Sequence, residues 1–306
     1  MAVESTDVSA TSRDRPLLGI ASKVLATLLF AFMFASIRWL GTYLPVGEIV
    51  FFRGLLGMIV IVIVALAAGG PQLLLTRHIG SHAVRSIAGT ISMFCYFSAY
   101  IFLPLADATA ITFASPLFVV ILAAMMLDEK VHAYRWSAVV IGFLGVLVIV
   151  GPEANLARGA ALGASLALMG AALAALAMIY IRRMSAHEHS VTIAFYFMVT
   201  SCTLSLLTLP FGWTVPGREQ ALVLLITGCS GGIGQVFLSL SYRYSEASVL
   251  APFDYVAMIW AVVLGYFVFD ELPTVGVWIG AAIVIAAGLM ILWRERKLHL
   301  ERGTPL

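Results

Sequence analysis

Residues 127–136 read LDEKVHAYRW, and residues 269–278 read FDELPTVGVW. The Asp-Glu pair and the Trp of the first segment recur 142 residues later in the second, and long apolar runs flank both segments. A repeat of this length within an apolar chain indicates two fused halves. Such internal repeats are typical of secondary transporters, whose binding sites lie where the repeats meet.

The composition points to lipid as the solvent. Hydrophobic residues make up 61% of the 306 residues and charged residues 11%, whereas an average soluble domain has about 45–50% and about 25%. The net charge of +2 is small and scattered, which argues against a nucleic-acid partner. The three cysteines lie in apolar runs without metal-ligand spacing, so we predict no disulfide, metal or cofactor.

A helix needs roughly 20 apolar residues to cross the hydrocarbon core of a membrane. Because backbone groups in lipid must satisfy one another, the long apolar runs should be helices. The sequence thus predicts an all-α membrane protein with ten transmembrane helices, at 17–41, 46–68, 83–103, 106–127, 133–151, 158–181, 190–211, 219–241, 246–269 and 274–293.

The basic residues set the predicted orientation. Fourteen Lys and Arg lie in the tails, the even-numbered loops and the helix ends beside them, whereas the opposite loops hold only Arg158 and Arg218. Basic residues stay on the cytoplasmic side, so both termini are predicted to be cytoplasmic. Because each half has five spans, an odd number, the second half is predicted to cross the membrane in the opposite orientation to the first. The predicted segments are a disordered tail at 1–16, repeats at 17–151 and 158–293, and a cytoplasmic tail at 294–306.

The paired motifs resemble a known family. "LDEK" and "FDEL" close spans four and nine, "PVGEIVFFRG" opens span two, and "APFDYVAMIWAVVLGYFVFDELP" forms span nine. This pattern is similar to the EamA-type branch of the drug/metabolite transporter superfamily, which includes amino-acid exporters. The resemblance implies a carrier of small metabolites that lacks an ATPase domain.

One departure from the repeat concerns the prolines. Pro116 lies thirteen residues before Glu129, but Met258 occupies the equivalent position in the second half, and Pro252 lies six residues earlier. We therefore expect the two halves to kink at different depths.

Polar side chains inside apolar spans mark the interior, because they are costly where they face lipid. They recur at helical spacing on spans three, four, eight and nine. The alternative is that they only hold the helices together through hydrogen bonds. We predict that they line a cavity for a small amphipathic solute, formed by Ser92, Tyr96, Tyr100, Thr112, Ser115, Gln235, Ser239, Tyr242, Asp254 and Tyr255.

Asp254 is the acid that lies well inside an apolar span, two residues after Pro252. It could contact a substrate ammonium or accept a proton. The structural alternative is an ion pair with Lys23, which lies at a similar depth on span one. Neither alternative is settled by the sequence.

A second group of charges lies toward the outer face and comprises Arg38, Glu48, Arg53 and Asp107. We expect these charges to act as gating or structural residues, with Arg38 pairing with Glu48, or Arg53 with Asp107. Arg53 matches the arginine of span two in the family, which could also bind a carboxylate. Asp128, Glu129, Asp270 and Glu271 are interpreted as caps of spans five and ten, because carboxylates favour helix N-termini.

The sequence therefore predicts a secondary transporter of the inner membrane that works as a monomer by alternating access. Amino acids, including aromatic ones, are the first substrate class. Uptake of riboflavin or S-adenosylmethionine is the alternative within the family. A channel and a membrane-embedded enzyme are more distant alternatives. The six histidines lie in predicted loops or tails, so they provide no buried catalytic pair.

Overall fold

The computed structural model describes residues 15–68, 70–76, 78–126, 133–151, 158–184, 188–245 and 247–302. These residues form a bundle of α-helices with short 3-10 turns and no strands. The helices of the first half are α1 (Pro16–Leu40), α2 (Val46–Ala68), α3 (Ile79–Phe102), α4 (Leu105–Thr112), α5 (Ser115–Met126) and α6 (Ala133–Val150). Those of the second half are α7 (Arg158–Met184), α8 (Ser190–Leu206), α9 (Arg218–Tyr244), α10 (Ala247–Leu250), α11 (Val256–Phe269) and α12 (Val275–Arg302).

Three 3-10 turns complete the described chain, namely η1 (Pro71–Leu74), η3 (Leu209–Phe211) and η4 (Ala251–Tyr255). The predicted spans coincide with these helices, but their ends differ. The first residues of α3 precede the predicted span, so His82 lies inside a helix and is buried. The placement of that histidine in a loop was wrong. The last helix also runs to Arg302, beyond the predicted end of span ten.

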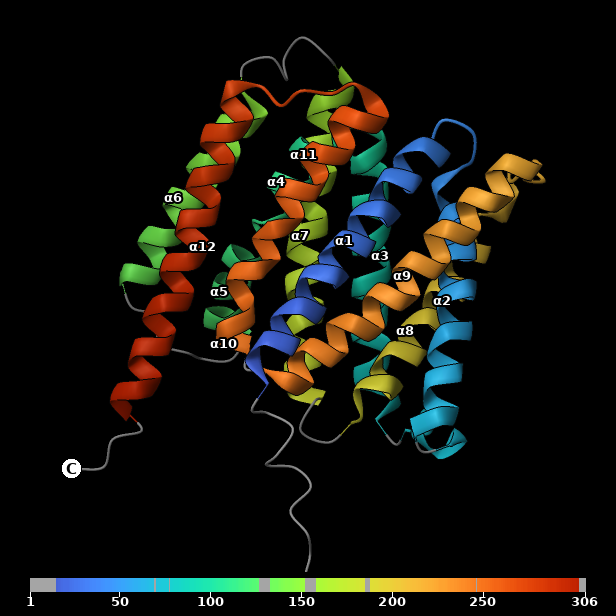
Figure 1. The fold of residues 1–306 in the computed structure, drawn as a ribbon, viewed down its shortest axis with the longest axis horizontal. Helices are drawn as coiled ribbons and strands as arrows, with labels where there is room; N and C mark the ends of the chain where they lie inside the picture. Colours follow the sequence, from blue (N-terminus) through green and yellow to red (C-terminus); the bar gives the residue numbers. More distant parts are fainter. Residues whose placement is uncertain are drawn as a thin grey trace, which may run out of the picture.

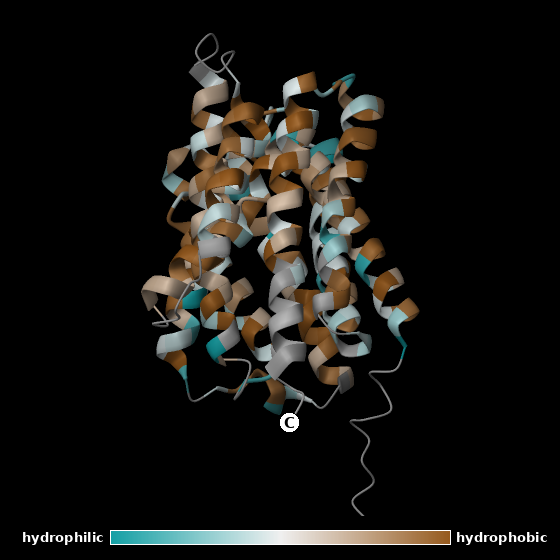
Figure 2. Ribbon diagram, turned by 90° about the vertical axis from the view of Figure 1, so that its left-hand side faces the viewer, coloured by the Kyte–Doolittle hydropathy of each residue, from teal (hydrophilic) through white to brown (hydrophobic). Residues whose placement is uncertain are grey.

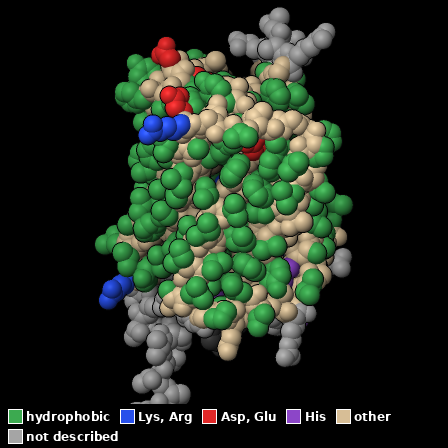
Figure 3. All heavy atoms as spheres, turned by 90° about the vertical axis from the view of Figure 1, so that its right-hand side faces the viewer, with side chains coloured by type: hydrophobic (Ala, Val, Ile, Leu, Met, Phe, Trp, Pro, Cys, Tyr) green, Lys and Arg blue, Asp and Glu red, His purple; other side chains and the backbone are tan. Residues whose placement is uncertain are grey.

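The surface of the bundle is apolar. Six of the described helical segments are long and apolar enough to cross a membrane, and three shorter apolar helices accompany them. Hydrophobic side chains cover most of the middle of one face in Figure 3, with charged side chains toward its two ends. Brown, hydrophobic residues likewise recur along the length of the helices in Figure 2. The described part of the chain is therefore built to be surrounded by lipid.

The packing of the helices follows the repeat. The most extensive contacts join α1 to α9, α3 to α7, and α6 to α12. Under the 142-residue repeat, α1 corresponds to α7 and α3 to α9, so the first two pairs are copies of one another. The third pair joins the two equivalent helices, as expected for halves related by an approximate twofold axis.

Close approaches between helices give the direction of each half. A Cβ added to Gly19 of α1 would collide with Ser245, which follows the C-terminal end of α9. In α7, Gly163 is similarly closed by Leu103 at the C-terminal end of α3. Leu103 and Ser245 are 142 residues apart. The N-terminal parts of α1 and α7 lie at opposite ends of the bundle, so the two helices run in opposite directions (Figure 1).

Candidate functional site

A small cavity of about 70 Å³ lies inside the bundle, between α1, α3, α4 and α11. Its lining is aromatic and aliphatic with a few hydroxyl groups, and comprises Thr27, Phe30, Ala31, Phe34, Tyr100, Leu105, Thr109, Thr112, Phe113, Ala257 and Ala261. Pockets that hold drug-sized ligands measure about 300–1,000 Å³. In this structure the cavity is therefore smaller than a typical ligand pocket.

One wall of the cavity is made by Tyr100 of α3 and Phe34 of α1. Their rings stack with centroids 4.3 Å apart. The Tyr100 hydroxyl lies 3.2 Å from the Thr109 hydroxyl of α4, while Thr112 donates to the Thr109 carbonyl at 2.7 Å. The hydroxyl groups are thus held in place beside a flat aromatic surface, an arrangement that suits a solute with both polar and apolar parts.

The α1 helix carries a polar residue beyond each end of this cavity. Lys23, Thr27, Phe34 and Arg38 are spaced by four, seven and four residues, which places them along one face of a helix. At a rise of 1.5 Å per residue, Lys23 and Arg38 lie about 22 Å apart along the axis. The cavity lies between them.

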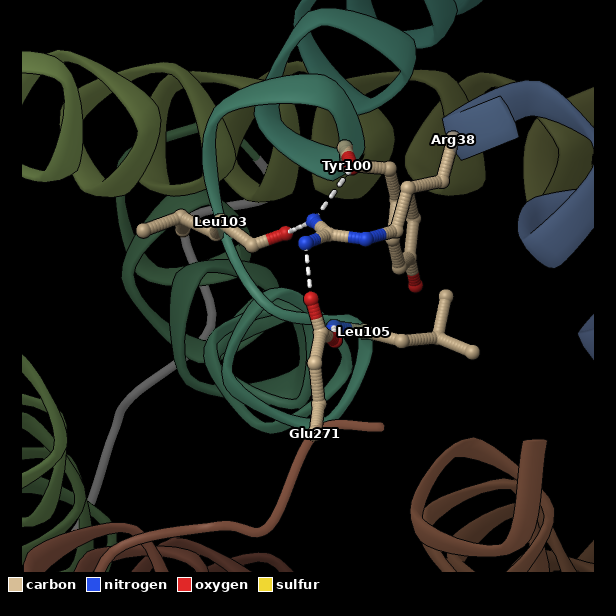
Figure 4. A network of polar contacts seen from close by, with 5 residues as sticks. All are labelled: Arg38, Tyr100, Leu103, Leu105 and Glu271. Carbon is tan, nitrogen blue, oxygen red and sulfur yellow. Dashed lines mark hydrogen bonds and ion pairs between the residues drawn. The ribbon is translucent and has the colours of Figure 1, made fainter. Parts of the chain in front are cut away.

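At one end, Arg38 joins three segments of the chain (Figure 4). Its guanidinium donates to the carbonyl groups of Tyr100 and Leu103, at the C-terminal end of α3, and forms an ion pair with Glu271. The other carboxylate oxygen of Glu271 accepts from the backbone N–H of Leu105 at 3.1 Å, at the start of α4. This network, which we call the Arg38 latch, ties α1 to α3, α4 and the segment after α11.

The backbone at Asp270 directs Glu271 inward. Asp270 has φ 56° and ends α11 in the left-handed region, and the N–H of Glu271 then bonds back to the Gly265 carbonyl at 2.9 Å. The prediction that Glu271 caps span ten was wrong. Glu271 caps α4 instead. At the N-terminus of α12, the hydroxyl of Thr274 accepts a hydrogen bond from the N–H of Val277 at 3.4 Å. Asp128 and Glu129 lie outside the described residues.

At the other end, Lys23 forms an ion pair of 2.6 Å with Asp254 in η4 and donates to the Tyr242 hydroxyl at 3.2 Å. We call this group the Lys23 latch. The Lys23 side chain is 2% exposed, whereas that of Asp254 is 51% exposed. The ion pair considered for Asp254 is thus formed, and it joins α1 to the segments on either side of α10.

The broken spans meet beside the cavity. Phe113 follows α4 and Tyr255 ends η4, and their rings contact each other edge to face with centroids 5.0 Å apart. These two residues are 142 positions apart in the sequence, so the irregular segments of the two halves overlap at this one equivalent position. The rest of η4, Ala251–Asp254, corresponds to residues 109–112, which are helical in α4, so the breaks differ in length and starting depth, in line with the expected mismatch.

The structure divides the predicted solute-contacting residues. Tyr100 and Thr112 line the cavity. Tyr242 and Asp254 belong to the Lys23 latch, and Tyr255 packs on Phe113. The remaining residues lie away from the cavity lining: Ser92 donates to the Gly170 carbonyl at 2.7 Å, Tyr96 packs on Gly170, Ser239 donates to the Gln235 carbonyl at 2.9 Å, and Gln235 and Ser115 are half-buried.

The predicted pairs among the outer charges were also wrong. Arg38 pairs with Glu271, and Glu48 accepts from the backbone N–H of Thr214 at 3.1 Å. Arg53 contacts the Met198 sulfur at 3.3 Å rather than Asp107, which lies in the first turn of α4. A helix-wheel argument gives the face of a residue, but not the neighbouring helix that meets this face.

The sequence reasoning missed the contribution of α1. Thr27, Phe30 and Phe34 line the cavity and come from a helix that was not assigned to the solute path. The signal was present, because the spacing from Lys23 to Arg38 is that of one helix face. The apolar character of Phe30 and Phe34 hid it, since a search for polar stripes passes over aromatic residues.

Comparison with known proteins identifies the family. The EamA-like transporter family matches residues 17–151 and 161–293, once for each half. The pseudopaline exporter CntI of Pseudomonas aeruginosa is 32% identical over 286 residues, which cover 90% of this chain and 93% of that protein. An S-adenosylmethionine uptake transporter of Rickettsia prowazekii is 28% identical and covers 85% of this chain and 87% of its own length.

A riboflavin transporter of Vibrio cholerae is 28% identical over 302 residues, covering 95% of this chain and 98% of its own length. A solved crystal structure that covers 92% of this chain has a TM-score of 0.64 at 19% identity, which supports the fold alone. The resemblance carried by the paired motifs is confirmed. The chain is a multi-pass protein of the inner membrane and belongs to the EamA-like transporter family.

Proposed function

We propose that the protein is a secondary transporter that carries a small metabolite by alternating access, with the solute held between α1, α3, α4 and α11. The observation that carries this proposal is the position of the cavity between two ion-paired latches. The Lys23 latch joins α1 to η4, and the Arg38 latch joins α1 to Glu271, two residues after α11. Breaking one latch while the other holds would open the cavity to one side at a time.

The proposal includes ten spans as an inverted five-plus-five repeat, with residues 17–151 and 158–293 as the two halves. The matched packing of α1 on α9 and of α3 on α7, and the opposite directions of α1 and α7, support it. The family match to each half supports it as well. The basic residues place both termini in the cytoplasm, which makes the Arg38 latch the outer one.

Amino acids, including aromatic ones, are the proposed first substrate class. The stacked rings of Phe34 and Tyr100 offer a flat surface, and the hydroxyl groups of Thr109 and Thr112 lie beside it. The named relatives carry pseudopaline, S-adenosylmethionine and riboflavin. Riboflavin or S-adenosylmethionine is the second proposed substrate, since a flat ring system would stack on the same surface.

The transport proposal is tested with purified protein in liposomes. Vesicles loaded with unlabelled aromatic amino acid should accumulate the labelled amino acid transiently, with saturable kinetics, and riboflavin and S-adenosylmethionine serve as parallel solutes. Flux that does not saturate and needs no internal solute would indicate a channel instead.

The outer latch is tested by labelling Thr109→Cys, in a background without the native cysteines, with a membrane-impermeant maleimide in intact cells. Glu271→Gln should speed the labelling about tenfold, because the charge-assisted bond to Arg38, which contributes about 1.5–3 kcal/mol, is lost. Glu219→Gln, an exposed acid in the first turn of α9, is the matched control. An unchanged labelling rate in Glu271→Gln would contradict the gating role.

A further inference from the structure

Two arginines lie near each other away from the latches, and neither has an acidic partner among the residues that the structure describes. Arg53 extends from α2 and is 6% exposed, while Arg85 extends from α3 and is half-buried. Their side chains contact the same ring: the Cζ atoms of Arg53 and Arg85 lie 5.9 and 4.2 Å from the centroid of Phe197, on α8. The two like charges therefore lie within about 10 Å of each other inside the bundle.

The hydrogen-bonding groups of these arginines are largely unused. Among the described residues, Nε of Arg53 and both Nε and Nη1 of Arg85 are buried without a hydrogen-bond partner, and the contact given for Nη1 of Arg53 is the Met198 sulfur at 3.3 Å. The buried hydroxyl of Ser86, next to Arg85, has no partner in that part of the chain either. An unpaired buried charge is strongly unfavourable, and guanidinium groups within a membrane are normally paired.

The acid of the neighbouring loop is already engaged. Glu188 accepts from the Thr76 hydroxyl at 2.5 Å and lies 3.5 Å from His82. His82 and Arg85 are three residues apart on α3, so they lie on the same side of this helix. The carboxylate of Glu188 therefore reaches only the first turn of α3, and within the described residues it does not compensate the charges of Arg53 and Arg85.

The group lies between α2, α3, α8 and α9, which pack together on the right-hand side of Figure 1. Arg53 lies seven residues after the start of α2, and Arg85 lies six residues after the start of α3. The α9 helix contributes Gly231, where an added Cβ would lie 2.8 Å from Sδ of Met33 and 3.4 Å from Nε of Arg53. A side chain at this position would therefore crowd the guanidinium.

We propose that Arg53 and Arg85 form a binding site for a small dianion, a dicarboxylate or a phosphate, outside the cavity between α1, α3, α4 and α11. Two guanidinium groups match two negative charges, and their planar N–H pairs suit the oxygens of a carboxylate or phosphate. This site does not depend on the proposed transport function.

Binding is measured as a change in the unfolding temperature of the purified full-length protein in nanodiscs of phosphatidylcholine. Succinate and inorganic phosphate should raise that temperature in a saturable way, whereas chloride at equal ionic strength should not. Arg53→Met and Arg85→Met should each weaken the apparent affinity for both probes at least about tenfold. Arg85→Lys keeps the charge but loses the planar pair of donors, so its affinity should lie between those of the unmodified protein and of Arg85→Met. Arg218→Met, at the exposed start of α9, is the matched control and should bind as the unmodified protein does.

Three results would overturn the proposal: no saturable stabilisation of the unmodified protein, retained affinity in both methionine variants, or stabilisation by phosphatidylglycerol nanodiscs but by neither soluble probe. The last result would identify a lipid headgroup. Anion binding without counterflow of any solute in the liposomes described above would contradict the transport function and not the site.

Discussion

Lys23 and Asp254 form one ion pair in two different environments. Lys23 is almost fully buried, and half of the Asp254 side chain is exposed. A buried charge that loses its partner is strongly destabilising, whereas an exposed charge that loses its partner is nearly neutral. The two halves of this pair should therefore differ in their effect on stability.

Asp254→Asn should destabilise the purified protein by about 3–5 kcal/mol, because it leaves the Lys23 ammonium buried without a counter-charge. Lys23→Met should cost only about 1 kcal/mol or less, since the carboxylate left behind is half exposed. Thermal unfolding of both variants measures the difference. The double variant should recover most of the stability lost in Asp254→Asn, and equal losses in the two single variants would contradict this account.

Single residues were only partly predictable. Tyr100 and Thr112 were placed correctly in the cavity lining because their helix face and their polarity agree. The partner of Arg38 was not predictable, since Glu271 lies 233 residues away and reaches it only through the left-handed turn at Asp270. Local rules favour an acid at the next helix N-terminus, and tertiary packing placed this one at a distant helix.

Among the helix pairs, α6 and α12 depend on small residues. Gly145 and Gly280 face each other there: a Cβ on Gly145 would lie 2.9 Å from the Gly280 carbonyl, and one on Gly280 would lie 2.8 Å from the backbone N of Ile149. Backbone atoms cannot move aside as the end of a flexible side chain can. Small residues allow this close contact, as is common between helices in membranes.

Gly280→Val should destabilise the protein by about 1–3 kcal/mol, as overpacking of an interface does. Gly80→Val is the matched control, because Gly80 lies in the first turn of α3 with no other atom within 4 Å of an added Cβ. Thermal unfolding of the two variants in the same detergent provides the measurement. A loss in Gly80→Val as large as that in Gly280→Val would show that helix propensity, and not packing, is responsible.

Helix breaks were harder to predict than helices. The apolar runs gave α2 at its predicted ends, because length and hydropathy suffice in lipid. The position of the prolines suggested unequal kinks, and the breaks do differ: the first half leaves the α-helix at Phe113–Ala114, just before Pro116, and the second at Ala251–Tyr255, which contains Pro252. Proline removes a backbone donor, so a break lies beside each proline, and the two breaks meet through the contact between Phe113 and Tyr255.

At the scale of the whole molecule, the two ends of the bundle carry different loops. The segment before α9 contains Val215, which is 96% exposed, and this segment lies at the same end of the bundle as the Arg38 latch. Gln72 in η1 is exposed at the opposite end. These two positions report on the proposed orientation without disturbing a helix.

Val215→Cys, in a background without the native cysteines, should react with an impermeant maleimide in intact cells. Gln72→Cys should react only after the membrane is permeabilised, since the proposed orientation, based on the basic residues, has that end in the cytoplasm. Mass spectrometry of the purified protein measures the labelling. The reverse pattern would invert the molecule, and the Arg38 latch would then face the cytoplasm.

The architecture was more predictable than the contacts, because the repeat constrains every helix at once. The 142-residue offset relates Leu103 to Ser245 and Phe113 to Tyr255, and the packing respects both relations. The charges have no such constraint, so Lys23 and Arg38 of α1 have no repeated counterpart at Ser165 and Tyr180.

The placement of both latches on one helix has a mechanical consequence. With attachments about 22 Å apart, α1 is a lever, and whichever ion pair remains intact is its fulcrum. A small rotation at the fulcrum becomes a large displacement at the free end. Under the proposed gating, the cavity-lining residues midway along α1 would move only about half as far as its free end, so the path beside a bound solute would change sides with a smaller shift at the solute itself.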